Sequence, residues 1–355
     1  MSVNPTIKLT EVCNFNCVYC EYRSFSFTQK KKRVIDPELA IEIAKQCIHF
    51  NAKESKETNF CWHGGEPLLY PTENFRLILD EISRIASSVG VSVSHSLQTN
   101  GYLIDSNWLD LISYFQIMVG VSLDGPEDIN GMQREKDVIS TVLKNIKLLK
   151  EIDCFSGVLT VLTENHKGRE KDLFDFYLKN GITKVGFCKA FNFDLSHTIS
   201  NETLTEFMIR FFDLYFDSKY PLNVREYNAY ISKLLHKKHS NYCFTSSRKA
   251  CGQFITFNPN GDLFFCDDSY NATNKIGNIT DSNLSNLLTD ELFIKKAQMI
   301  RNVINVSCHD CDLFCICGCG CYRNDIDNYS KNYFCPTYKA LISHIKHRIE
   351  AVCRN

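Results

Sequence analysis

Short runs of apolar, β-branched and aromatic residues recur through the first half of the chain, separated by longer stretches of helical period. Bounded runs of about four to eight such residues are typical of buried strands. Strands are therefore expected at Ile7–Thr10, Asn59–Trp62, Val91–Leu97, Ile117–Leu123, Gly157–Leu162 and Lys184–Cys188.

Apolar residues between these runs recur every three or four positions, as on the buried face of a helix. The first such stretch follows Asp36, a good N-cap with proline directly after it. Helices are expected at Pro37–Phe50, Phe75–Ser87, Ser106–Tyr114, Val138–Ile152 and Asp172–Asn180. Regular alternation of strand and helix predicts βαβ units and a parallel sheet, here an incomplete (β/α)6 barrel resembling a TIM barrel.

The pattern changes twice beyond the barrel. Residues 192–242 read as an aromatic-rich helical segment, which we interpret as a linker packing on the barrel; a platform for a peptide substrate is the alternative. From Cys243 the chain becomes turn-rich and cysteine-rich. We therefore expect a barrel over 1–191, a bridging region over 192–242, and a cysteine-rich domain with a C-terminal helix over 243–355.

Composition excludes several classes of protein. The 355 residues are 44% hydrophobic and 23% charged, an ordinary globular mixture, and the formal net charge is -1. That balance predicts no nucleic-acid partner. No apolar run approaches the roughly 18 residues of a membrane span, and no signal peptide is recognisable. We expect a cytoplasmic protein without a membrane partner.

Cysteine is the exception, with 18 residues that cluster near the start and beyond position 240. In a large chain without an export signal, clustered cysteines indicate metal binding rather than disulfides. The first cluster, Cys13, Cys17 and Cys20, has the spacing C-x3-C-x2-C directly after the first expected strand. Three thiolates can hold three irons of a [4Fe–4S] cluster and leave the fourth iron open for a ligand. A zinc knuckle or buried free thiols are the alternatives.

This segment resembles the radical S-adenosylmethionine (SAM) superfamily, whose hallmark is this motif in this place. Gly64, Gly65 and Glu66 resemble the glycine-rich motif with which that family approaches the SAM amine. Matches to positions that contact SAM in sulfatase-maturase-like members add Tyr19, Ser122 and Arg134. The resemblance implies that a reduced cluster cleaves SAM to a 5′-deoxyadenosyl radical, which takes a hydrogen atom from the substrate.

The C-terminal cysteines resemble the SPASM extension of peptide- and protein-modifying radical SAM enzymes, which holds two auxiliary [4Fe–4S] clusters. The resemblance assigns auxiliary cluster I to Cys243, Cys251, Cys266 and Cys321. It assigns auxiliary cluster II to Cys308, Cys311, Cys317 and Cys335. Cys243 stands farther from Cys251 than the maturase pattern leads us to expect, and Cys315 and Cys319 are additional. A structural zinc site is the alternative.

Asp267 directly follows Cys266. This Cys-Asp dipeptide matches the position at which sulfatase maturases carry their proposed proton acceptor. A carboxylate there could take a proton while the substrate radical becomes product. A turn aspartate is the alternative.

The resemblance implies an enzyme that acts on a peptide or protein. Our main interpretation is maturation of a ribosomally made precursor peptide by a carbon–carbon or thioether crosslink. The alternative is an anaerobic sulfatase maturase that oxidises Cys or Ser to formylglycine, and a non-catalytic iron–sulfur electron carrier is the third hypothesis. A flavodoxin or ferredoxin is the expected electron donor. Only 12 residues precede Cys13, so we expect no N-terminal leader-binding domain.

Overall fold

A computed structural model describes most of the chain, in seven stretches. These are residues 2–20, 33–192, 197–237, 248–266, 275–302, 308–326 and 331–354. Cys243 and Asp267 lie outside the described residues. The chain divides into two compact units. Unit 1 comprises Met1–Ser122, Val138–Ser156 and Cys251–Gln298, and unit 2 comprises Leu123–Asp137, Gly157–Ala250 and Met299–Asn355. The three domains drawn from the sequence stay a prediction.

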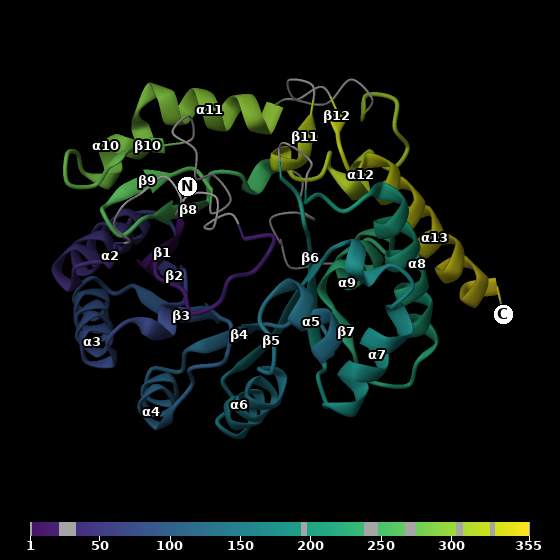
Figure 1. The fold of residues 1–355 in the computed structure, drawn as a ribbon. Helices are drawn as coiled ribbons and strands as arrows, with labels where there is room; N and C mark the ends of the chain where they lie inside the picture. The colour runs from purple at the N-terminus through teal and green to yellow at the C-terminus, as the bar shows by residue number, and fades with distance from the viewer. Residues whose placement is uncertain are drawn as a thin grey trace. The chain divides into compact units, whose positions relative to one another are not determined.

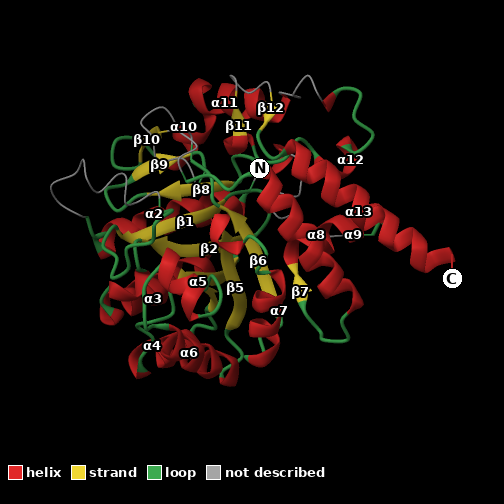
Figure 2. Ribbon diagram, turned by 45° about the vertical axis from the view of Figure 1, so that its right-hand side comes forward, coloured by secondary structure: helices red, strands yellow, loops and turns green. Residues whose placement is uncertain are grey.

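Unit 1 is built on a sheet with the strand order β10-β9-β8-β1-β2-β3-β4. Its strands are β1 (Asn4–Thr10), β2 (Glu57–Gly64), β3 (Ser92–Thr99), β4 (Met118–Ser122), β8 (Phe254–Phe257), β9 (Asp262–Phe264) and β10 (Lys275–Asn278). Its helices are α2 (Pro37–Ala52), α3 (Thr72–Val89), α4 (Ser106–Tyr114), α6 (Ile139–Glu151), α10 (Leu284–Thr289) and α11 (Glu291–Asn302), which continues past the unit boundary. Strands β8, β1 and β2 lie side by side (Figure 2).

The sheet formed by the parallel strands of unit 1 has one apolar face and one more polar face. Trp62 of β2 is fully buried, and its ring meets Phe75 of α3 edge-on at 5.0 Å. In Figure 1, α2 and α3 lie beside β1, β2 and β3. Side chains alternate between the two faces of a strand. Lys8 and His63, which are register partners on β1 and β2, therefore point away from that helical layer.

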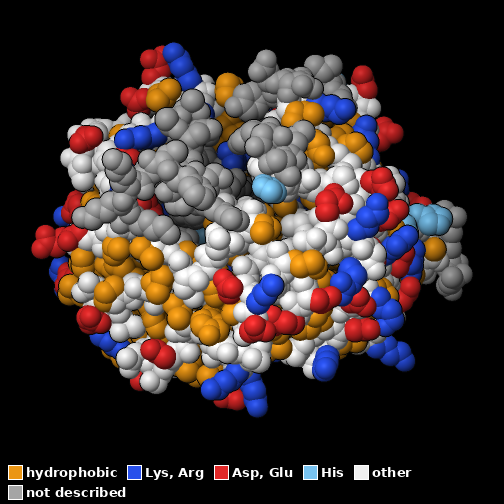
Figure 3. All heavy atoms as spheres, viewed as in Figure 1, with side chains coloured by type: hydrophobic (Ala, Val, Ile, Leu, Met, Phe, Trp, Pro, Cys, Tyr) orange, Lys and Arg blue, Asp and Glu red, His pale blue; other side chains and the backbone are white. Residues whose placement is uncertain are grey.

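Unit 2 contains the parallel strands β5 (Phe155–Leu162), which begins at the end of unit 1, β6 (Lys184–Lys189) and β7 (Asn223–Val224), in that order. Its helices are α5 (Glu127–Gln133), α7 (Glu170–Lys179), α8 (Asn201–Asp217), α9 (Arg225–Leu234), α12 (Phe314–Cys317) and α13 (Cys335–Arg354). The short strands β11 (Asp325–Ile326) and β12 (Lys331–Asn332) form an antiparallel pair. Side chains of both charges lie over α5 and α7, where Arg169 pairs with Asp128 at 2.7 Å (Figure 3).

The aromatic residues of α8 form part of the core of unit 2. Phe207, Phe211 and Phe212 are fully buried. The ring of Phe211 meets that of Phe187 on β6 at 5.1 Å. Burial of large aromatic rings against one another stabilises a core strongly. Phe211 therefore has no surface to offer a substrate, while the interpretation of residues 192–242 as a bridging region stays a prediction.

None of the described helices is long and apolar enough to cross a membrane.

Candidate functional site

The three N-terminal cysteines follow β1 in one short loop, as the sequence predicts. Cys17 is buried, whereas Cys13 and Cys20 are half-buried. The backbone N–H of Phe15 donates to the Cys13 sulfur at 3.4 Å, and that of Cys20 donates to the Cys17 carbonyl at 3.2 Å. Within the described ranges, no three His, Cys, Asp or Glu side chains already have the spacing of a metal site. The assignment of metal ligands therefore depends on the donor set and on the family.

The glycine motif packs against the backbone that leads into this loop. The N–H of Gly65 donates to the Thr10 carbonyl at 2.7 Å, and that of Glu66 donates to the Val12 carbonyl at 2.8 Å. A Cβ atom on Gly65 would lie 2.6 Å from the Val12 carbonyl carbon, closer than real Cβ contacts allow. Gly64 has φ +146, a conformation that favours glycine. The glycines thus give the cysteine loop its close approach to β2.

Glu66 is a buried carboxylate that joins three segments. One oxygen accepts from the Thr99 hydroxyl at 2.6 Å and from the Leu68 N–H at 3.0 Å, and the other accepts from the Asn100 N–H at 2.8 Å. The Asn100 side chain in turn donates to Asn14 in the cysteine loop at 2.8 Å. The expectation that Glu66 binds cofactor stays a prediction, and the described contacts add a positioning role for its carboxylate, which residue type alone does not reveal.

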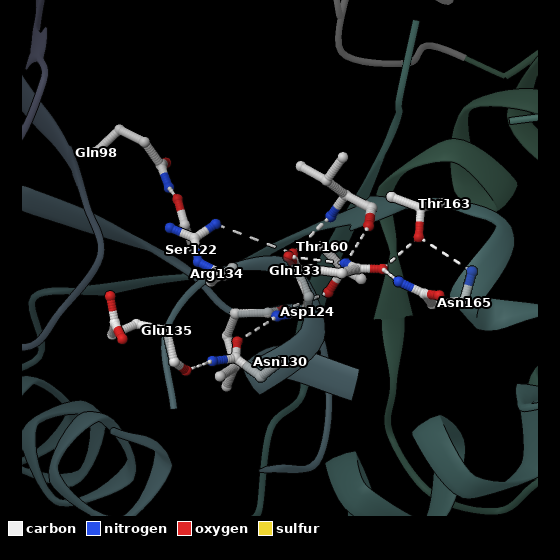
Figure 4. Close-up of polar contacts among 12 residues, drawn as sticks. Gln98, Ser122, Asp124, Asn130, Gln133, Arg134, Glu135, Thr160, Thr163 and Asn165 are labelled. Carbon is white, nitrogen blue, oxygen red and sulfur yellow. Dashed lines mark hydrogen bonds and ion pairs between the residues drawn. The ribbon is translucent and has the colours of Figure 1, made fainter. Parts of the chain in front are cut away.

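Ser122 lies at the end of β4 and is held by Gln98. The Gln98 amide donates to the Ser122 hydroxyl at 2.8 Å (Figure 4). A Cβ atom on Gly120 would collide with the Gln98 side-chain oxygen, so glycine at that position makes room for this contact. The Ser122 hydroxyl proton remains available to a ligand, because the hydroxyl accepts from Gln98.

Arg134, in unit 2, stands next to a fully buried carboxylate, Asp124, whose place after the fourth strand run is visible in the sequence but whose pairing with Arg134 is not. Its guanidinium lies 4.0 Å from Asp124, whose side chain is 0% exposed. The Asp124 carboxylate also accepts from the Val161 N–H at 2.9 Å and from the Gln133 amide at 3.0 Å (Figure 4). The Gln133 side-chain oxygen accepts from the Thr163 hydroxyl. Buried charges are tolerated when they are paired and hydrogen-bonded, and Asp124 meets that condition.

An antiparallel hairpin brings two predicted auxiliary ligands to one end. β8 and β9 pair with Thr256 opposite Phe264, so Cys266 falls opposite Phe254, three residues after Cys251. β8 also pairs in parallel with β1, with Thr6 opposite Thr256. The cysteine-rich segment thus extends the sheet of unit 1, which the sequence analysis did not predict.

The remaining described auxiliary ligands belong to unit 2 and crowd one another. Burial first, and then hydrogen bonding and charge repulsion from Cys319, raise the pKa of Cys308 to about 12. Burial, followed by repulsion from Cys335, Cys319 and Cys311, raises the pKa of Cys317 to about 12. Buried thiols this close cannot ionise together without a compensating cation, and metal coordination supplies one. A group of thiols is compatible with a metal site such as an iron–sulfur cluster, and Cys319, which the resemblance left unassigned, lies near Cys308 and Cys317.

Within unit 2, a buried ion pair joins Arg248 to Asp325, which follows Cys321 by four residues. Arg248 donates to both Asp325 oxygens, at 2.8 and 2.6 Å, and both side chains are buried. Asn332 donates to Asp325 at 3.1 Å and to the Cys321 carbonyl at 2.8 Å. The network has no sequence motif, because its members lie up to 84 residues apart along the chain.

Comparison with protein families bears directly on these features. The radical SAM superfamily matches residues 7–176, and the SPASM iron–sulfur cluster-binding domain matches residues 249–312. The chain therefore contains a radical SAM domain and a SPASM domain. The mixed α/β fold with a parallel sheet and the two kinds of cofactor, SAM and [4Fe–4S] clusters, are thereby confirmed. The two matches do not test individual residues, so the ligand role of each cysteine stays a prediction, and the SPASM match ends before Cys317, Cys321 and Cys335.

Relatives match almost the whole length of this chain. The cysteine-type anaerobic sulfatase-maturating enzyme of Clostridium perfringens (strain 13 / Type A) is 24% identical over 364 residues, which cover 97% of this chain and 96% of the relative. The serine-type anaerobic sulfatase-maturating enzyme of Bacteroides thetaiotaomicron is 23% identical, with 94% and 87% covered. The solved structure of native anSMEcpe with bound AdoMet and Cp18Cys peptide has a TM-score of 0.86 at 22% identity and covers 100% of both chains. That likeness shows a shared fold.

Proposed function

We propose that this radical SAM enzyme oxidises a cysteine or serine side chain of a peptide or protein substrate to formylglycine. The observation that supports this proposal most directly is that both named relatives are anaerobic sulfatase-maturating enzymes. They match this chain over more than nine-tenths of its length. The relatives thus favour sulfatase maturation, the alternative in the sequence analysis, over the peptide crosslink that was our main interpretation.

The reaction is a two-electron oxidation at the side-chain Cβ. When bound, the reduced cluster and SAM supply a carbon radical that takes one hydrogen atom from Cβ, and an auxiliary cluster accepts the second electron. The hydroxyl or thiol proton leaves to a base. Serine then gives the aldehyde directly, whereas cysteine gives a thioaldehyde that water hydrolyses to the aldehyde and hydrogen sulfide. Asp267 is our candidate base because it directly follows Cys266 in the sequence.

The chain's own residues hold and orient the cofactors in this proposal. Cys13, Cys17 and Cys20 hold the SAM-binding cluster, and Gly64 and Gly65 set the position of their loop against β2. Ser122 and Arg134, together with Tyr19, contact SAM. Gln98 and Asp124 orient two of these side chains through the contacts described above. Correct orientation of a bound reactant supplies much of an enzyme's rate acceleration.

The test uses the full chain, reconstituted with iron and sulfide without oxygen. It is incubated with SAM, dithionite and two peptides that differ only in carrying Cys or Ser at the target position of a sulfatase. We expect an aldehyde that an aminooxy reagent captures, formed from at least one peptide. A product that loses two hydrogen atoms yet resists the reagent would be a crosslink and would contradict the proposal, as would no product with 5′-deoxyadenosine still formed.

A further inference from the structure

The Tyr338 hydroxyl is a buried donor without an acceptor among the described residues. Tyr338 is 6% exposed, and its oxygen has no hydrogen-bond partner there. Buried polar side chains are bonded in the large majority of cases, so each exception needs a physical reason. A hydroxyl costs free energy when it leaves water without a new partner. The position of this side chain indicates what the partner is.

Tyr338 is surrounded by cysteine-bearing segments of unit 2. It follows Cys335 by three residues on α13, and residues with that spacing share one face of a helix. Gly320 lies between Cys319 and Cys321 and has φ +66. A Cβ atom on Gly320 would come within 2.7 Å of the Tyr338 ring carbon Cε2. The absence of a side chain at Gly320 therefore lets the phenol ring lie against this segment.

Burial keeps the hydroxyl protonated, and a nearby cation makes it a better donor. Burial first, and then unfavourable electrostatic interaction with Cys317, Cys321, Asp325 and Cys335, raise the pKa of Tyr338 well above its ordinary value. At neutral pH the phenol therefore keeps its proton. The Lys189 ammonium lies 5.2 Å from the ring centroid. A cation over the ring draws electron density from it, which makes the O–H more polar.

We propose that the Tyr338 hydroxyl donates a hydrogen bond to a sulfur atom of the auxiliary cluster that Cys317 and Cys335 help to hold. Three observations coincide here: a donor without an acceptor among the described residues, a glycine that leaves room for the ring, and a cysteine one helical turn away. The proposal depends on the ligand roles of these two cysteines and not on the identity of the peptide substrate.

The consequence is electronic. Hydrogen bonds to the sulfurs of a cluster are one of the factors that set its reduction potential. A donor stabilises the reduced form more than the oxidised form, because the reduced form carries more negative charge. Tyr338 therefore raises the potential of this cluster, which makes it a better acceptor for the electron that leaves the substrate. It acts as a positioning and tuning residue and not as a catalytic one.

The test is Tyr338→Phe, which removes the hydroxyl and keeps the ring. It is made in a Cys13/Cys17/Cys20→Ala background, so that the auxiliary clusters are observed without the SAM-binding one. An anaerobic redox titration followed by electron paramagnetic resonance gives the midpoint potentials. We expect the midpoint potential of one auxiliary cluster to become about 59 mV more negative, which is a tenfold smaller equilibrium constant for one-electron reduction. The iron content should stay unchanged. Tyr220→Phe is the control, because that hydroxyl bonds the Ile182 carbonyl at 3.3 Å and should leave both potentials unchanged.

Equal potentials in Tyr338→Phe and its parent, at equal iron content, would overturn the proposal. If the variant loses iron, the hydrogen bond is tested instead with 3-fluorotyrosine at position 338. This residue keeps the hydroxyl and makes it a stronger donor. A positive shift supports the hydrogen bond, and no shift overturns it. A background protein that binds no auxiliary iron overturns it as well. Formylglycine formation is measured separately on the enzyme with all its clusters, so each proposal can fail alone.

Discussion

Gly65→Ala is the substitution that most directly tests how the cysteine loop is positioned. The added Cβ would lie 2.6 Å from the Val12 carbonyl carbon and 2.9 Å from that of Glu11. Both are backbone atoms, so no side-chain rotation relieves the overlap, and β2 must move away from the loop. The two hydrogen bonds from Gly65 and Glu66 to this backbone, at 2.7 and 2.8 Å, lengthen with that movement.

The expected cost follows from these contacts. Overpacking in a well-packed region costs about 1–3 kcal/mol, and each weakened hydrogen bond adds up to about 1 kcal/mol. We expect Gly65→Ala to lose about 1–5 kcal/mol of stability. Because Cys13 follows Val12 directly, the iron of the N-terminal cluster and SAM affinity should fall as well. The assays are urea unfolding of the apoprotein, iron content after reconstitution, and anaerobic calorimetry with SAM.

Gly90→Ala is the matched control. A Cβ atom there meets nothing within 4 Å, and the cost is limited to the positive φ of +66, about 1 kcal/mol. Iron content and SAM affinity should stay at the level of the unchanged chain. If Gly65→Ala resembled Gly90→Ala in all three assays, the close approach of β2 to the loop would not matter and our reasoning would be wrong.

Four further predictions concern other parts of the chain. Glu66→Gln places an amide donor beside existing donors and should cost about 2–3 kcal/mol in a thermal melt; an unchanged melt would contradict its positioning role. Asp124→Asn removes the charge beside Arg134 and should weaken SAM binding about tenfold, about 1.4 kcal/mol, whereas unchanged affinity would exclude coupling between them. Burial lowers the pKa of His95 to about 4, below the value of about 6.5 in an unfolded chain. The unfolded chain therefore takes up the proton first, and about 3 kcal/mol of apoprotein stability is lost as the pH falls from about 6.5 to 4; His95→Gln should flatten this slope. Phe211→Ala should cost about 3–5 kcal/mol and leave the peptide affinity of the folded fraction unchanged, and a specific loss of affinity would revive the platform hypothesis.

The barrel strands and helices could be predicted from the sequence because their signals are local. Lys184–Cys188 has the short apolar run of a buried strand, and Ser106–Tyr114 was predicted with the bounds that the structure shows. The β8–β9 hairpin was missed, because its strands have only four and three residues and β8 pairs with β1, which lies about 250 residues earlier. Pairing so distant along the chain leaves no periodic trace.

The candidate site shows the same division between local and distant information. Cys13, Cys17 and Cys20 were recognisable because their spacing is a motif. The contacts of Glu66 with Thr99 and Asn100 depend on the ends of β2 and β3 lying together. The environment of Tyr338 depends on Gly320, 18 residues away. Such residues carry ordinary side chains, and only the fold shows what surrounds them.

The most direct test of the central claim measures two products of one anaerobic reaction. The reconstituted enzyme and its Cys13/Cys17/Cys20→Ala variant receive SAM, dithionite and the Cys- or Ser-containing peptide, and 5′-deoxyadenosine and peptide aldehyde are quantified together. We predict that the enzyme forms both and that the variant forms neither. A fully iron-loaded enzyme that forms no 5′-deoxyadenosine, or aldehyde formation by the variant, would contradict radical SAM chemistry at this site.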